Sequence, residues 1–152
     1  MIILYGENEF TRKEKSKFCS IVFNREVDNR IKTFEILSSY KKVDKFGRCS
    51  GGMYLPDGEK NKMDMISNYK FSICFENSLY PGYYTEKLLH AKIAGNVPIY
   101  FADDNLSKDF NIDCCINTYK MNFEEVLDII KMIDRRHNFN ILSSYPFSIR
   151  RS

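Results

Sequence analysis

The sequence lacks the patterns that define several common protein classes. Its five cysteines, which form an odd number, include no CxxC pair, and neither of its two histidines stands at metal-ligand spacing. A disulfide framework and a zinc site are therefore not indicated. We expect no metal site, and we expect reduced thiols in a cytosolic protein. The cysteines are Cys19, Cys49, Cys74, Cys114 and Cys115.

Strong charge of one sign and long apolar runs are also missing. Lys and Arg total 23 against 20 Asp and Glu, and the resulting net charge of +3 is far below that of a strongly basic nucleic-acid-binding surface. We therefore expect no nucleic-acid partner, whereas a small anionic ligand is compatible with this charge. The first residues are apolar only up to Gly6 and then become charged, which fits neither a signal peptide nor a membrane span.

What the chain does contain is a regular alternation of two kinds of segment. With 152 residues, of which 43% are hydrophobic, it can bury the core of one domain. The glycine-bearing residues 47–58, which come after Val43 and Asp44, are interpreted as a long loop. The alternation predicts an α/β fold with an open, mostly parallel sheet. Strand-like runs are residues 17–23, 70–75 and 97–101, and helical segments are residues 30–40, 60–69, 86–94 and a stretch beginning at Asn122.

Residues typical of helix ends support two of these helices. Thr85 stands at the N-cap position of segment 86–94, and Gly95 follows it as the expected C′ residue. Asn122 is expected to cap the last helix, whose first turn contains Glu124 and Glu125, where the helix dipole favours them. The tail after residue 135 has no clear period and is either a packed extension or a loose one.

Polar side chains gather where a ligand would be expected. Ligands of parallel α/β sheets bind at the carboxyl ends of the strands, which points to residues 24–30 and 76–87. A helix N-terminus with Lys87 in its first turn favours a diphosphate, and Glu86 can accept hydrogen bonds from ribose hydroxyls. Asn77 and Tyr83 can donate hydrogen bonds to sugar or phosphate oxygens. On its own, the sequence TEK is explained more simply as a cap followed by solvated charges.

A longer pattern resembles a known family. Residues 75–102, FENSLYPGYYTEKLLHAKIAGNVPIYFA, are similar to the signature of family 10 fucosyltransferases, in which FEN, a short spacer, Y-x-TEK, a helix and a Val/Ile-Pro strand follow one another. The run KFC-x-IVF from Lys17, Arg30 at a helix start, and the run YKKVD at residues 40–44 belong to the same pattern. The resemblance is to the C-terminal domain of bacterial-type α-1,3-fucosyltransferases and covers residues 17–135.

The resemblance implies the Rossmann-like C-terminal half of a GT-B glycosyltransferase. Such an enzyme is metal-independent, needs no cofactor besides its donor substrate GDP-fucose, and transfers fucose with inversion to a glycan hydroxyl. Matched position by position, Arg30 would face the donor phosphates, and Asn77 and Tyr83 would lie in the donor site. Glu86 would bind the ribose, and Lys87 would neutralise the diphosphate leaving group.

Some parts of the family pattern have no counterpart. Residues 45–52 replace the Gly-rich run that usually follows Val-Asp. No segment matches the N-terminal half, which binds the acceptor and supplies the carboxylate general base, so the catalytic base stays unassigned. We expect residues 1–16 to be a linker remnant, residues 17–135 the nucleotide-sugar-binding domain, and residues 136–152 a C-terminal extension.

Several alternatives stay open from the sequence. Arg25 competes with Arg30 as a phosphate ligand, and His90 is interpreted as a surface or packed residue rather than a catalytic one. The first hypothesis is a fucosyltransferase whose acceptor half is missing from this chain. The second is a non-catalytic nucleotide-sugar-binding module or truncated remnant that needs a partner lobe. A signalling domain with a phosphorylatable Asp44 ranks last, because no acidic pair accompanies that residue.

The resemblance also implies a biological setting. The partners would be GDP-fucose and a glycan acceptor, and a lone lobe is expected to self-associate or to bind a partner lobe. The expected location is the bacterial cytoplasm, with peripheral association at the inner membrane through the rest of the protein. Protein glycosylation and lipopolysaccharide biosynthesis are the processes implied. The acceptor and the linkage stay open.

Overall fold

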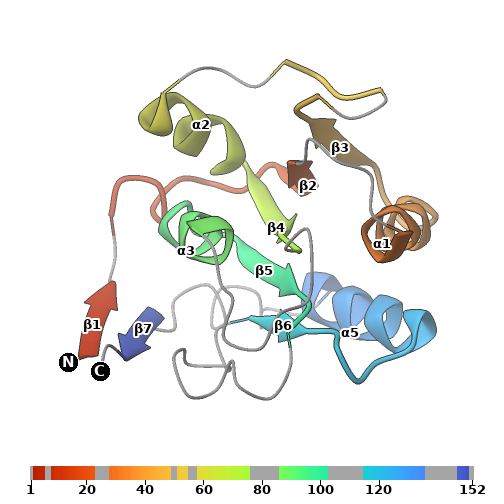
Figure 1. Cartoon of the computed structure of the whole chain (residues 1–152). Coiled ribbons are helices and arrows are strands. Elements are labelled where there is room, and N and C mark those ends of the chain that lie inside the picture. Colours follow the sequence, from red (N-terminus) through yellow and green to blue (C-terminus); the bar gives the residue numbers. More distant parts are fainter. Residues whose placement is uncertain are drawn as a thin grey trace.

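A five-stranded sheet is the centre of the molecule in the computed structural model, which describes residues 2–5, 8–22, 28–48, 51–54, 58–75, 86–102, 115–135 and 147–150. The strand order is β3-β2-β4-β5-β6, and all four neighbouring pairs are parallel (Figure 1). The expected open α/β sheet is therefore confirmed. The elements are β1 Ile2–Tyr5, β2 Lys17–Val22, α1 Asp28–Ser38, β3 Val43–Phe46, α2 Glu59–Ile66, β4 Tyr69–Ile73, α3 Glu86–Ile93, β5 Val97–Tyr100, β6 Ile116–Asn117, α5 Phe123–Arg135 and β7 Phe147–Arg150.

Two strands of this sheet lie where the sequence analysis predicts none. The sequence analysis assigns no element to residues 43–46, which form β3 and pair with β2. Its sequence VDKF has no apolar run, although Val43, Asp44 and Phe46 are all buried. Strand β6 has only two residues, too few to give a periodic signal.

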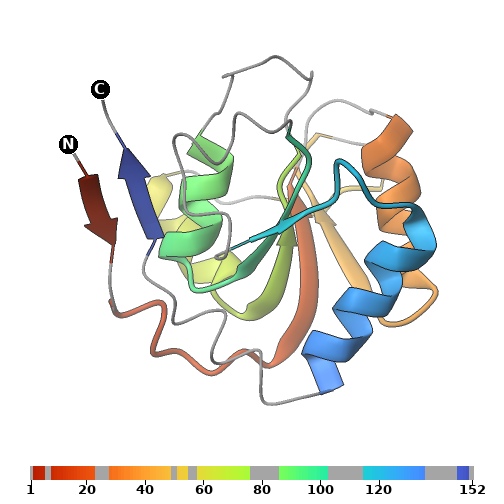
Figure 2. The ribbon, with the colours of Figure 1, turned by 90° about the horizontal axis from the view of Figure 1, so that it is seen from below.

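Helices cover both faces of the sheet (Figure 2). Helices α1 and α5 pack together on one face, and α2 and α3 pack together on the other. The largest core cluster joins strand residues such as Ile21, Phe71 and Ile99 to Leu37 of α1 and Ile130 of α5, all of them fully buried. Burial on both faces explains why β5, with the sequence VPIY, is apolar throughout and why Ser20 of β2 and Ser72 of β4 are buried as well.

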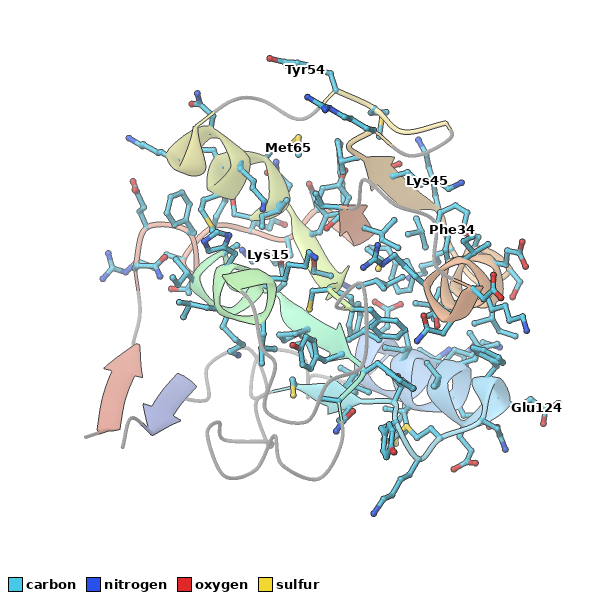
Figure 3. All side chains as sticks on the ribbon, viewed as in Figure 1. Lys15, Phe34, Lys45, Tyr54, Met65 and Glu124 are labelled. Carbon is cyan, nitrogen blue, oxygen red and sulfur yellow. The ribbon has the colours of Figure 1, made fainter. Side chains whose placement is uncertain are left out.

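Helix α1 buries two polar side chains on the face that packs against the sheet. Its buried residues are Arg30, Thr33 and Leu37, which share a face at the spacing i, i+3 and i+7. Phe34 is only partly buried, and the ammonium of Lys45 lies 4.3 Å from the centre of its ring (Figure 3). The inward position of Arg30 thus follows from its helical register.

Two predicted helix boundaries are confirmed, and the third, the N-cap at Thr85, lies outside the described residues. At the start of α5, the side chain of Asn122 accepts a hydrogen bond from the amide of Glu125, whose carboxylate in turn accepts one from the amide of Asn122. After α3, Gly95 has a φ of 78°. The amide of Asn96 donates to the carbonyl of Ala91, and the amide of Gly95 donates to the carbonyl of Lys92. This pattern is the Schellman motif, which the positive φ of a glycine favours.

The segment predicted as a linker contacts the body of the domain. The Lys15 ammonium donates hydrogen bonds to the carbonyls of Phe10, Ser67 and Ala94 at 2.8, 2.6 and 2.8 Å (Figure 3). Ser67 and Ala94 follow the last residues of α2 and α3, so one cation satisfies carbonyls at two helix C-termini. Strand β1 pairs with β7 in an antiparallel ladder, which brings the two ends of the chain together.

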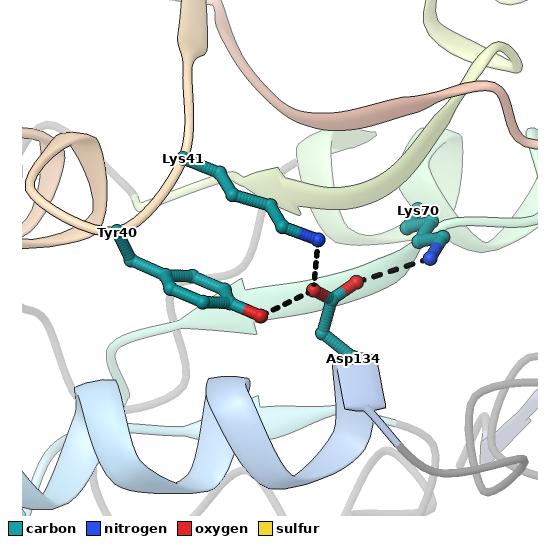
Figure 4. A network of polar contacts seen from close by, with 4 residues as sticks. All are labelled: Tyr40, Lys41, Lys70 and Asp134. Carbon is teal, nitrogen blue, oxygen red and sulfur yellow. Dashed lines mark hydrogen bonds and ion pairs between the residues drawn. The ribbon is translucent and has the colours of Figure 1, made fainter.

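Tyr40 and Lys41 of the YKKVD run belong to a polar cluster at the amino ends of the strands (Figure 4). Oδ2 of Asp134, near the end of α5, accepts hydrogen bonds from the Tyr40 hydroxyl at 2.6 Å and from the Lys41 ammonium at 2.7 Å. Its Oδ1 accepts one from Lys70 at 3.0 Å. These contacts join the start of β3, the start of β4 and the end of α5.

Candidate functional site

The strand order creates one natural place for a ligand. From β2 the chain goes through α1 on one face to β3, and from β4 it goes through α3 on the other face to β5. The connections after β2 and β4 therefore diverge, and open α/β sheets bind ligands in the crevice at such a switch point. Here the crevice lies beyond Val22 and Ile73, the last residues of these two strands.

Arg30 lies at this switch point. Its side chain is 1% exposed, and one guanidinium nitrogen donates a hydrogen bond to the carbonyl of Phe75, two residues beyond β4. The contact joins the start of α1 to the exit of β4 across 45 residues of sequence. Arg30 is therefore held against the exit of β4 at Phe75, and its contact with donor phosphates stays a prediction.

The other predicted donor-site residues lie at or beyond the edge of the described structure. Asn77, Tyr83 and the rival Arg25 lie outside the described residues. Glu86 is the first residue of α3, and its backbone alone is described. Lys87 is in the first turn of α3, as predicted, and is partly exposed.

A small pocket lies on the face of the sheet that α2 and α3 cover, next to the switch point. Its empty volume of about 350 Å³ includes space open to solvent. Val22 of β2 and Ile73 of β4 line it on one side, and Lys87 and His90 line it from α3. The structure thus brings Lys87 to a cavity at the carboxyl ends of β2 and β4, where the sequence predicts the ligand.

One lining residue was missed by the sequence analysis. Lys62 of α2 lines the same pocket as Lys87, although the segment containing it was interpreted only as a short helix. A signal was present, because Lys62 precedes the buried Ile66 by four residues and so lies on the same side of the helix. His90, interpreted from the sequence as a surface or packed residue, is partly buried at the pocket wall.

Asp44 lies inside β3, whereas a phosphorylation site would need an aspartate at the end of a strand. It is the second residue of β3, paired with Ser20, and it is 8% exposed. Its Oδ2 accepts a hydrogen bond from the Tyr69 hydroxyl at 2.7 Å. Burial, and then this bond, raise the pKa of Tyr69, so the hydroxyl stays protonated and donating. The signalling hypothesis therefore loses its only candidate for a phosphorylated aspartate.

The described cysteines pack as apolar residues. Cys19 and Cys74 are 0% and 5% exposed, which confirms the prediction that Cys74 belongs to the core. Burial raises the pKa of the Cys19 thiol, so the reactive thiolate is disfavoured. In the part of the chain that the structure describes, no three metal-ligating side chains form a cluster, and no helix is long and apolar enough to cross a bilayer.

Comparison with protein families gives a match over most of the chain. Residues 10–142 match the model of "Glycosyltransferase family 10 (fucosyltransferase) C-term". A protein of Acanthamoeba polyphaga mimivirus named as a fucosyltransferase is 33% identical over 133 residues, which are 80% of this chain and 22% of the relative. The α-(1,3)-fucosyltransferase FucT of Helicobacter pylori is 40% identical over 80 residues, which are 52% of this chain and 17% of the relative.

Mammalian relatives and solved structures agree with this match. The 4-galactosyl-N-acetylglucosaminide 3-α-L-fucosyltransferase 9 of Bos taurus is 32% identical over 85% of this chain and 36% of the relative. A crystal structure of an α1,3-fucosyltransferase with GDP-fucose superposes with a TM-score of 0.75 at 27% identity, over 91% of this chain and 40% of that one. The chain thus spans well under half the length of these relatives. Because they come from a virus, a bacterium and a mammal, the bacterial location stays a prediction.

Proposed function

Since this chain belongs to glycosyltransferase family 10, through the C-terminal domain of its fucosyltransferases, we propose that it binds GDP-fucose as the donor lobe of a GT-B fucosyltransferase. The observation that carries the proposal is the position of Lys87, in the first turn of α3 and at a pocket on the switch point of the sheet. A helix N-terminus and a lysine together favour a diphosphate. The related crystal structure with GDP-fucose supports the choice of nucleotide sugar.

In this proposal the residues of the chain act on the leaving group. As the bond between fucose and the β-phosphate breaks, negative charge grows on the diphosphate, and the Lys87 ammonium stabilises it without the need for a metal ion. Arg30, held by the carbonyl of Phe75, faces the donor phosphates with its guanidinium group. Glu86 accepts hydrogen bonds from the ribose, and Asn77 and Tyr83 bind the sugar or phosphate oxygens.

Transfer itself requires a second lobe. Inversion needs a base that removes the proton of the acceptor hydroxyl as it attacks, and we assign this base to a part of the enzyme that corresponds to the remaining length of the relatives. The chain alone then binds the donor without transferring fucose. Metal independence, a glycan acceptor and a role in lipopolysaccharide biosynthesis belong to the same proposal.

Calorimetric titration of GDP-fucose and GDP into the purified chain tests the binding. We expect saturable binding that weakens about 10-fold or more in Lys87→Ala, the loss typical of a hydrogen bond to a charged group. Lys42→Ala is the matched control, because this lysine is 87% exposed and precedes β3 at the opposite, amino end of the strands. The absence of binding at millimolar ligand, or equal losses in both variants, would contradict the proposal.

A second assay separates binding from turnover. The chain is incubated with GDP-fucose and a β-galactosyl N-acetylglucosamine acceptor, and released GDP is measured. We expect binding without acceptor-dependent release. Acceptor-dependent release by the chain alone would show that the base lies within these 152 residues.

A further inference from the structure

The pocket between α2 and α3 has cationic residues on two walls. Lys87 and His90 line it from α3, and Lys62 lines it from α2. Among the described residues, no carboxylate lines this pocket. Two lysine side chains that line one cavity from different helices can both donate hydrogen bonds to an anion held there.

Packing fixes the position of Lys62. Helix α2 buries Met63 and Ile66, which pack against Ala94 just after α3. The fully buried Asn96 donates hydrogen bonds from its side-chain amide to the carbonyls of Ile66 and Tyr69, so it joins the end of α2 to the turn that follows α3. The two helices therefore form a rigid frame that holds Lys62 and Lys87 around one cavity.

We propose that Lys62 is a second phosphate-binding residue of the donor site and binds the diphosphate of the nucleotide together with Lys87. This inference rests on the proposed function and adds a residue to it that lies outside the TEK segment. A nucleoside diphosphate has more than one negative charge, so a single ammonium leaves part of that charge unbalanced. Lys62 brings a second positive charge to the same cavity from a different helix.

The same helix supplies a matched control. Lys60 is exposed and lies two residues before Lys62, but it lines a different pocket, with Glu9 and Phe10. Lys62→Met and Lys60→Met each remove one positive charge from α2 and keep a helix-forming side chain. A difference between these variants reports direct contact rather than the overall charge of the helix.

Calorimetric titrations of GDP, GMP and guanosine into the full chain and both variants test the contact. We expect Lys62→Met to weaken GDP binding about 10- to 100-fold, and Lys60→Met to change it less than about 2-fold. Guanosine, which has no phosphate, should bind both variants equally. Lys62→Arg should recover most of the affinity for GDP, and thermal unfolding checks that each variant is folded.

The outcomes separate this inference from the proposed function. If Lys62→Met binds GDP as the original chain does while Lys87→Ala does not, the inference is wrong and the proposed function stands. Equal losses in the Lys60 and Lys62 variants, or an equal loss for guanosine, would also overturn it, since neither reports a phosphate contact. If the original chain binds neither GDP nor GDP-fucose, the proposed function fails, and the inference fails with it.

Discussion

Replacing Asp134 by Asn tests the polar cluster at the amino ends of the strands. The Asp134 side chain is 1% exposed, and it accepts hydrogen bonds from Tyr40, Lys41 and Lys70. Asn has the same shape but no charge, and its amide group has to face an ammonium that formerly met a carboxylate oxygen. The substitution therefore removes the negative charge that Lys41 and Lys70 meet, and it leaves one acceptor oxygen where there were two.

The expected loss follows from how far each partner is buried. Breaking a fully buried ion pair costs about 3–5 kcal/mol, whereas an exposed pair contributes about 0–1 kcal/mol. The side chains of Lys41 and Lys70 are 48% and 32% exposed, so water can solvate them once the carboxylate is gone. We expect Asp134→Asn to lower the free energy of unfolding by about 2–4 kcal/mol at pH 7.

The acid range gives a second measurement of the same carboxylate. Burial alone would raise the pKa of Asp134, but hydrogen bonds from Lys41, Tyr40 and Lys70 outweigh it and hold the pKa below its ordinary value. The unfolded chain therefore binds this proton more readily, so the free energy of unfolding rises with pH in this range. The contribution is complete above the unfolded pKa of about 3.9 and is lost as pH falls through the folded pKa.

Urea unfolding followed by circular dichroism measures both effects, at pH 7 and in steps down to about pH 2.5. Asp128→Asn is the control, because Asp128 is exposed on the same helix and its loss should change the free energy of unfolding by less than about 0.5 kcal/mol. The Asp134 variant should show a shallower acid loss than the original chain. Equal stability of both variants at pH 7, with the same acid slope, would refute the reasoning.

Three further substitutions test other contacts, each by the midpoint of urea unfolding. Gly95→Ala should cost about 2–4 kcal/mol, because φ is 78° and the new Cβ would lie 2.9 Å from the backbone of Thr11; a loss below about 1 kcal/mol would contradict this close approach. Lys15→Met should cost about 1–3 kcal/mol, since carbonyls at two helix ends lose their donor, and an unchanged midpoint would argue against that contact. Asn122→Ala should cost about 1 kcal/mol through the lost cap of α5, and Asn122→Asp should retain most of the stability.

Local signals in the sequence were sufficient for much of the fold. Asn122 and Gly95 mark helix boundaries because capping and positive φ depend only on neighbouring residues. Strands β2, β4 and β5 were predicted because each contains a short run of β-branched and aromatic residues. Strands β3 and β6 were missed because they are short and VDKF has no periodic apolar pattern.

In the candidate site, too, some residues were placed from the sequence and others needed the structure. The TEK segment placed Lys87 at a helix start from the sequence alone, and the structure agrees. That Arg30 is buried against the carbonyl of Phe75 needed the packing of α1 on the sheet, since these residues are 45 apart in the chain. For Lys62 the sequence offered only its position four residues before Ile66, and its place at the pocket follows from the packing of α2 beside α3.

By itself, the sequence determined the family, two helix ends and where three buried strands lie along the chain, because each of these depends on short runs of neighbouring residues. Tertiary structure alone decided which distant side chains meet. Asp134 and Tyr40, 94 residues apart, are joined because the sheet brings α5 back to the start of β3. Such contacts depend on how whole elements pack, and no local pattern of residues contains that information.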